Sequence, residues 1–180
     1  MNEKAVVEAY RAFIVSKEST IVEGITFQGQ PKAFHQVVGT NLTPPTGYLY
    51  ILVICLGGPE RSQPVTNMQR PTRMTAYRMR IEITDQALYT QGETSPYSQM
   101  HDDFRLIVDR IADLIEKENW IGTTPKVRLQ RQEGEGDRQI EKLNLSGIWQ
   151  DARNVSWATL HSQLNFTAEG YVDTTVGLYP

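Results

Sequence analysis

The stretch that decides the fold is residues 73–120, RMTAYRMRIEITDQALYTQGETSPYSQMHDDFRLIVDRIADLIEKENW. Over residues 73–83 apolar side chains alternate with charged ones, and the alternation is clearest between Tyr77 and Ile83. A period of two is typical of a β-strand with one buried face. The first part of this stretch therefore predicts one long strand.

The second part of the stretch changes to helical spacing. Ser95 offers a hydroxyl for the helix N-terminus, and Pro96 suits the first turn. The apolar residues that follow fall on one stripe of an amphipathic helix that runs to about Asn119; they are Met100, Phe104, Ile107, Val108, Ile111, Leu114 and Ile115.

The residues before this unit predict a helix and two strands. Residues 2–17 show helical periodicity, and Asn2 can cap that helix. Residues 20–27 are β-branched and predict a short strand. Residues 48–56 form a continuous apolar run, which predicts a strand buried on both faces, central in the sheet and antiparallel to the strand at residues 73–83. A long polar loop, residues 60–72, separates these two strands.

The residues after the long helix predict further strands. Thr84 and Asp85 are expected to begin a turn, and residues 87–90 either extend the strand or form a brief helical turn before the long helix. Residues 126–132 and 140–149 predict a β-hairpin whose second strand has Leu143, Leu145 and Trp149 on one face. Residues 156–168 predict a last strand. Its inward residues are Ala158, Leu160, Leu164 and Phe166, and its outward residues are Trp157, Thr159, His161, Gln163 and Asn165.

This order of elements predicts the α+β class. We expect one domain over residues 1–168 and a C-terminal arm over residues 169–180. The domain would hold a mainly antiparallel sheet, with the N-terminal helix and the long helix packed on one face. The loop at residues 60–72 would extend from it.

Composition limits the function classes. The chain has 180 residues, 39% of them apolar, which is a little low for a compact monomer. This fraction fits either a small domain with long polar loops or a subunit that completes its burial in an assembly. A net charge of −3 and a pI near 5.6 argue against a general nucleic-acid binder. The single cysteine, Cys55, excludes an internal disulfide, and its apolar neighbours predict a buried, unreactive thiol.

The sequence begins without the features of a signal peptide. The longest apolar run, residues 48–56, is far too short to span a bilayer. We therefore expect a chain that is made in the cytoplasm and has no membrane partner.

The candidate chemistry is sparse. His101, Asp102 and Asp103 form one histidine–carboxylate cluster, which could ligate a metal ion or could be the solvated first turns of a helix, where acidic residues are favoured. We expect the second, and hence no catalytic residue, metal or cofactor, although an enzyme built from scattered residues stays open.

The densest basic region lies in the polar loop and on the following strand. It could face nucleic acid or an acidic partner, or simply solvate a strand face. The exposed edge of the sheet is a further candidate for contact between subunits. The candidate residues for subunit or partner contact are Arg61, Arg70, Arg73, Arg78, Arg80, Trp157 and Tyr179.

Three segments carry a resemblance to a known family. They are Pro44-Pro45-Thr46-Gly47-Tyr48-Leu49-Tyr50, Tyr77-Arg78-Met79-Arg80-Ile81-Glu82-Ile83-Thr84-Asp85, and the helical series Tyr97, Met100, Ile107, Ile111 and Leu114. In their order and spacing they resemble the tail terminator, or tail completion, proteins of tailed bacteriophages. The order of predicted helices and strands resembles that family over most of the chain.

The resemblance implies a structural virion protein without catalytic residues. Such proteins are α+β subunits that form a hexameric ring, which caps the tail tube and provides the docking face for the head. It implies the tail-tube protein as the main partner, with sheath and neck or connector proteins as further partners. DNA would pass through the lumen of the ring without specific binding, and the ring would assemble in the host cytoplasm. Head–tail adaptor or stopper proteins are the alternative, and a small metal-dependent enzyme using His101, Asp102 and Asp103 is a third.

Overall fold

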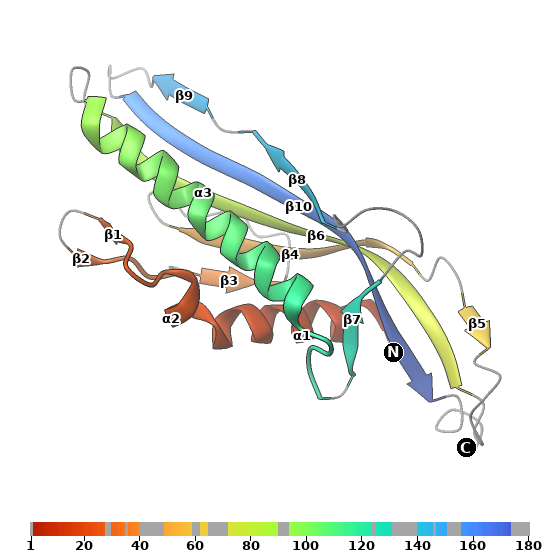
Figure 1. Cartoon of the computed structure of the whole chain (residues 1–180). Helices are drawn as coiled ribbons and strands as arrows, with labels where there is room; N and C mark the ends of the chain where they lie inside the picture. Colours follow the sequence, from red (N-terminus) through yellow and green to blue (C-terminus); the bar gives the residue numbers. More distant parts are fainter. Residues whose placement is uncertain are drawn as a thin grey trace.

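The computed structural model describes residues 2–27, 30–34, 36–39, 49–58, 62–64, 72–89, 94–123, 125–130, 140–145, 147–150 and 156–173. Two long strands form its frame, β6 (Thr72–Tyr89) and β10 (Ser156–Asp173) (Figure 1). They pair antiparallel without interruption, from Thr72 opposite Asp173 to Tyr89 opposite Ser156. At about 3.3 Å per residue, each strand is roughly 60 Å long.

The shorter strands attach to the two long ones. On the side of β6 lie β4 (Tyr50–Gly57), which is antiparallel to it, and β5 (Ser62–Pro64) near its start. β3 (Gln36–Val38) pairs with β4 in parallel orientation. Along β10 lie, one after another, β7 (Val127–Leu129), β8 (Glu141–Asn144) and β9 (Gly147–Gln150), and a separate small sheet pairs β1 (Thr26–Phe27) with β2 (Gln30–Pro31).

The α+β class is confirmed. The sequence predicted a mainly antiparallel sheet, but the sheet is mixed. The parallel pair of β3 and β4 makes the difference. Periodicity shows that a segment is extended, but it carries no information on the direction of the neighbouring strand. As expected, β4 is antiparallel to β6 and lies inside the sheet, between β3 and β6, with its first four residues buried.

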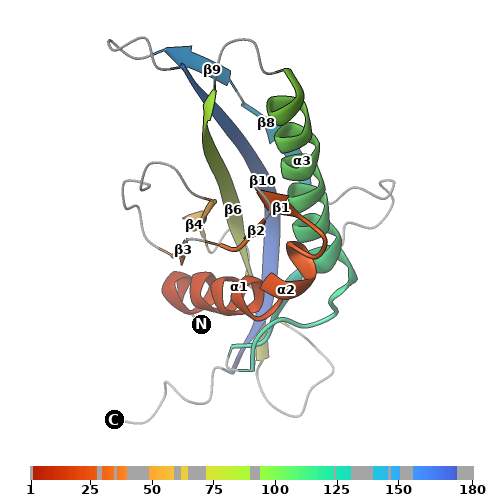
Figure 2. The ribbon, with the colours of Figure 1, turned by 90° about the vertical axis from the view of Figure 1, so that its left-hand side faces the viewer.

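The helices are α1 (Glu3–Ser16), the short α2 (Glu18–Ile21) and α3 (Thr94–Lys117). The predicted N-terminal cap is confirmed, since Asn2 Oδ1 accepts a hydrogen bond of 2.9 Å from the amide of Ala5. The long amphipathic helix is confirmed as well. Figure 2 shows α3 running alongside β6 and β10, with α1 near their lower ends.

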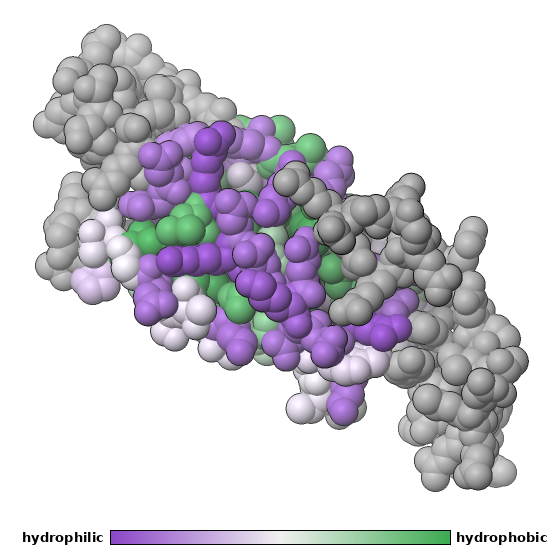
Figure 3. All heavy atoms as spheres, in the orientation of Figure 1, coloured by the Kyte–Doolittle hydropathy of each residue, from purple (hydrophilic) through white to green (hydrophobic). Residues whose placement is uncertain are grey.

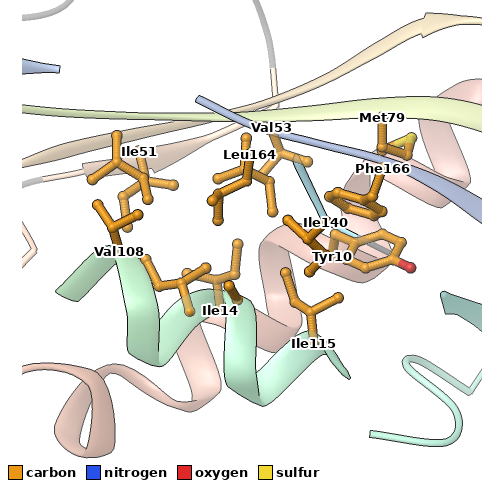
Figure 4. Close-up of a cluster of buried hydrophobic side chains, with 14 of the residues drawn as sticks. Tyr10, Ile14, Ile51, Val53, Met79, Val108, Ile115, Ile140, Leu164 and Phe166 are labelled. Atoms are coloured by element: carbon orange, nitrogen blue, oxygen red, sulfur yellow. The ribbon is translucent and has the colours of Figure 1, made fainter. Parts of the chain in front are cut away.

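One hydrophobic core joins the helices to the sheet (Figure 4). Side chains from α1, α3, β4, β6 and β10 meet in it. Each fully buried aliphatic or aromatic side chain contributes about 1.5–3 kcal/mol. The labelled members are Tyr10, Ile14, Ile51, Val53, Met79, Val108, Ile115, Ile140, Leu164 and Phe166.

The strand predicted at residues 20–27 is largely wrong. Ile21 belongs to α2, and only Thr26–Phe27 is extended. Contacts from far along the chain hold the segment in this form: Arg110 of α3 donates hydrogen bonds to the carbonyl oxygens of Ile21 (2.9 Å) and Glu23 (2.8 Å). Such tertiary contacts outweigh the local β-propensity of branched residues.

The turn predicted at Thr84 and Asp85 is also wrong, because β6 continues to Tyr89. Asp85 is buried and forms an ion pair with Lys32, which follows β2. The two side chains are only 5% and 10% exposed. A buried carboxylate needs such a partner, so the pair fixes the small β1–β2 sheet to the main one.

The β-hairpin predicted from residues 126–132 and 140–149 is not found among the described residues of these segments. β7, β8 and β9 each pair with β10 and not with one another. Leu143 and Leu145, which the sequence places on one face of the second predicted strand, are 38% and 58% exposed.

The last strand is longer than predicted. β10 runs past Ala168 to Asp173, so Glu169–Asp173 pairs with β6 and does not belong to an arm. Buried Glu169 binds Arg128 of β7 at 2.6 Å, and the Arg128 guanidinium stacks 5.0 Å from the Trp120 ring centroid. The outward residues predicted for this strand are confirmed for Thr159, His161, Gln163 and Asn165, which are half-buried between the buried positions.

Replacing Asp85 by Ala leaves Lys32 without its buried carboxylate. We expect Asp85→Ala to lower the free energy of unfolding by about 3–5 kcal/mol in urea titrations. The matched control is Asp109→Ala, whose partner Lys142 lies 2.8 Å away in an exposed pair, and which should cost less than about 1 kcal/mol. The double variant Lys32→Met/Asp85→Leu should recover most of the loss; equal effects of the two Ala variants would contradict the assignment.

The hydroxyl of Tyr10 offers a second test of the core. It is buried and has no hydrogen-bond partner among the described residues, while its ring packs on Phe166 with centroids 5.1 Å apart. Tyr10→Phe should leave the free energy of unfolding unchanged or raise it by about 1–2 kcal/mol, because an unsatisfied polar group is removed. Tyr10→Ala should cost about 3–5 kcal/mol. A clear loss of stability in Tyr10→Phe would show that the hydroxyl is bonded.

Candidate functional site: the polar face of the sheet

The side chains of β6 and β10 that point away from the helices form one surface, which we call the polar face. Alternation along the paired strands places them there, since their neighbours in sequence are buried in the core. The polar face consists of Arg78, Arg80, Glu82 and Thr84 on β6 and Thr159, His161, Gln163, Asn165 and Thr167 on β10. Arg78 is exposed and the others are half-buried.

A network of polar contacts crosses three strands of this face. Arg80 Nε donates a 2.9 Å hydrogen bond to Asn165 Oδ1, and Asn165 Nδ2 in turn donates to Glu141 of β8 at 3.3 Å. Glu82 accepts from Gln163 at 3.3 Å and lies 3.6 Å from Arg80 Nη1. These contacts connect side chains of β6, β10 and β8 across the face.

His161 belongs to the same face. Its Nδ1 lies 2.8 Å from the hydroxyl of Thr84, directly across the β6–β10 ladder. Burial lowers the pKa of the imidazole, Arg80 lowers it further, and Glu82 opposes the shift. His161 is therefore neutral at pH 7, and its ring nitrogen is used in a structural hydrogen bond.

Of the predicted contact residues whose side chains the structure describes, Arg78 and Arg80 stand together on the polar face. Arg73 lies opposite Val172 in the β6–β10 ladder, and Trp157 lies opposite Leu88, at the other end of the same ladder. Arg61, Arg70 and Tyr179 fall outside the described residues. The strand face predicted from alternation is present, but the loop arginines cannot be added to it.

Sequence reasoning missed the partners of these arginines. Glu82 and Asn165 could be assigned to the outward positions of their strands from the period of two. Their contact with Arg80, and the contribution of Glu141, depend on the register between strands that are far apart in the chain. No local signal gives that register.

The cluster of His101, Asp102 and Asp103 lies in α3. His101 Nδ1 is 4.0 Å from Asp102 Oδ1. Burial raises the pKa of the Asp103 carboxyl; Lys32 opposes the shift, while Asp102 and Asp85 add to it. Among the described residues, no group of three or more His, Cys, Asp or Glu side chains is placed to hold a metal ion.

Cys55 lies in β4 and is half-buried against the core, whereas the sequence predicted full burial. Burial raises the pKa of its thiol, the Gly57 carbonyl contact opposes that shift, and Glu3 adds to it. The thiol is therefore protonated at neutral pH and poorly nucleophilic.

A groove of about 480 Å³ runs between α1 and the turn that follows α3. Its walls are mostly small and apolar, with Ala5, Ala9, Ala12, Phe13 and Pro125. At the floor, Gly122 has φ of +78°, and a Cβ there would lie 2.7 Å from the Pro125 carbonyl oxygen. The polar side chains of Glu8, Ser16 and Thr123 also line the groove.

The surface that carries α3 is mainly hydrophilic, with small apolar patches between the charged residues (Figure 3). Within the parts of the chain that the structure describes, no helix is both long and apolar enough to cross a membrane. No protein-family model and no curated protein sequence matches this chain.

The lowered pKa of His161 predicts a pH-dependent stability. Below about pH 6.5 the unfolded chain binds a proton at this residue that the folded chain does not. The free energy of unfolding should thus be highest above that pH and fall as the pH drops toward the folded-state pKa. An NMR titration, with His161→Gln to assign the signal, should find an imidazole titrating below 6.5. That variant should lose less stability on acidification, whereas titration above 6.5 would contradict the geometry.

Proposed function

We propose that this chain is a structural subunit of the virion of a tailed bacteriophage. It would be a tail terminator, whose copies assemble into a ring of six that caps the tail tube and joins it to the neck and head. The observation that carries the proposal is the polar face, a rigid sheet surface whose side chains are already bonded to one another. The resemblance of residues 77–85 and of the following helix to the terminator family supports the same role.

The hydrogen bonds within the polar face favour a role in docking a partner protein over a role in catalysis. Arg80, Glu82 and Asn165 are held by cross-strand partners; His161 forms a hydrogen bond with Thr84, and burial lowers the pKa of its imidazole. Side chains fixed in this way lose little further conformational entropy when a partner covers them. Such a surface suits a subunit that must dock repeatedly in one orientation.

The long β6–β10 pair supports the same function by its shape. A ribbon of roughly 60 Å extends beyond the region that the helices cover, so one subunit can reach a neighbour or the tube. In this proposal the chain needs no cofactor or metal, works without catalysis, and lets DNA pass through the ring without binding it specifically. A tail-tube protein is the main partner, with neck, connector or sheath proteins as others.

The ring and its docking can be tested on purified protein. Light scattering should give about six times the chain mass of 20.5 kDa. Electron microscopy of the protein mixed with tail tubes, built from the tube protein of the same genome, should show added density at one end of each tube. A chain that stays monomeric and ignores tubes would refute the proposal, and binding to head portals instead would identify a head–tail adaptor or stopper.

A charge reversal connects this test to the polar face. Arg78→Glu should weaken tube binding or ring formation at least tenfold, because Arg78 is the exposed charge of that face. The matched control is Lys117→Glu, which makes the same change of charge at the exposed C-terminal turn of α3 and should have no effect.

A further inference from the structure

The first observation is the groove of about 480 Å³ between α1 and the turn that follows α3. Ala5, Ala9 and Ala12 lie on one face of α1, and their small side chains leave this space open. Gly122 approaches the helix so closely that a Cβ there would lie 3.1 Å from the Cβ of Ala9. Ala12 and Gly122 are exposed and the ring of Phe13 is half-buried, so the apolar lining is accessible from the surface.

The groove suits an uncharged occupant. Among the described lining residues Glu8 carries the only charge, and its Oε2 accepts a hydrogen bond of 2.8 Å from Arg11 Nε. Ser16 and Thr123 add hydroxyl groups to the lining. Because covering an unpaired charge is costly, an apolar segment without charges fits this lining best, and a tyrosine hydroxyl can bond to the polar groups.

The second observation is the sequence that follows β10. Residues 174–180 read TTVGLYP, carry no charge and contain Val176, Leu178 and Tyr179. In an extended chain, Val176 and Leu178 point to the same side and stand about 7 Å apart. This spacing is close to the helix pitch of about 5.4 Å, so the two side chains can lie over successive turns of α1.

The groove lies at the end of the sheet toward which β10 runs. Val127 of β7 lies opposite Gly170 of β10 and forms a second antiparallel bridge with Ile121. The turn that contains Gly122 connects these two bridged positions. Since β7 is antiparallel to β10, this turn lies level with the last residues of β10, which ends at Asp173.

The composition of the segment favours contact with a neighbouring copy over contact with its own groove. Residues 174–176 are Thr-Thr-Val, which favours an extended chain and contains none of the residues typical of a tight turn. Six extended residues span about 20 Å. Tyr179 is thus carried beyond the end of the sheet, whereas the groove of the same copy lies level with Asp173.

We propose that residues 174–180 of one copy bind in the groove of the next copy, with Leu178 and Tyr179 as apolar anchors. The occupant of the groove is thus a second copy of this chain. The contact joins two different surfaces, and contacts of this kind close into rings or extend as filaments. The inference rests on the proposed ring and names a contact that builds it.

The first test uses two full-length variants that each remove one partner surface. Leu178→Asp/Tyr179→Asp removes the anchors, and Ala12→Trp fills the groove from an exposed position of α1. Alone, each should raise the dissociation constant of self-association at least tenfold in analytical ultracentrifugation. An equimolar mixture should form one-to-one heterodimers, because each variant supplies the surface that the other lacks. Val15→Trp, exposed on α1 outside the described lining, is the matched control and should assemble as the wild type does.

The second test measures the contact without assembly. A fluorescent synthetic peptide of residues 173–180 is titrated with the full-length Leu178→Asp/Tyr179→Asp chain, which keeps the groove but lacks the anchors. Fluorescence anisotropy should show saturable binding, and adding Ala12→Trp to that chain should weaken it at least tenfold. The same peptide with Asp at positions 178 and 179 is the control and should not bind.

The outcomes separate this inference from the function. Absent peptide binding, peptide binding that ignores Ala12→Trp, or variants that assemble like the wild type would each overturn the contact and leave tube binding to decide the function. Peptide binding by a chain whose wild type is monomeric would place the segment in its own groove and also overturn the contact between copies. Circular dichroism checks the folding of each variant. If Ala12→Trp fails to fold, Ser16→Trp replaces it, since Ser16 is exposed and lines the same groove.

Discussion

The antiparallel pairing of β6 with β10 is the interaction on which the rest of the structure depends. Its register is continuous from Thr72–Asp173 to Tyr89–Ser156, and every other strand of the main sheet except β3 pairs directly with one of the two. The partners are distant in sequence, so the ladder can form only after a large loop has closed. Slow folding is the expected consequence of such long-range pairing.

The same pairing separates core from surface. Successive side chains of the ladder point alternately to the helix side of the sheet and to the polar face. A shift of one residue in the pairing would therefore move every side chain to the opposite face. The buried pair of Asp85 with Lys32 and the contact of Glu169 with Arg128 add charge-specific constraints near the two ends. Ion pairs of this kind tolerate little displacement, because an uncompensated buried charge is costly.

The polar face illustrates how far sequence reasoning reached for the candidate site. The alternation around Arg78 and Arg80 predicted an outward strand face, and that prediction is confirmed. What the alternation could not supply is the partner of each residue. Asn165 reaches Arg80, and Glu141 reaches Asn165, only because β8, β10 and β6 lie side by side, in a register set by packing of the opposite face.

The sequence by itself determined the local elements with strong periodicity: the capped N-terminal helix, the strand around residues 73–83, the long amphipathic helix and the alternation of the last strand. These follow from apolar spacing, which acts within a few residues. The tertiary structure decided the parallel pair of β3 and β4, the extension of β6 through Asp85 and of β10 to Asp173, and the placement of β7, β8 and β9 along β10. Those features depend on which distant strand supplies the hydrogen bonds and which distant cation neutralises a carboxylate, and such partners are chosen only when the chain has folded.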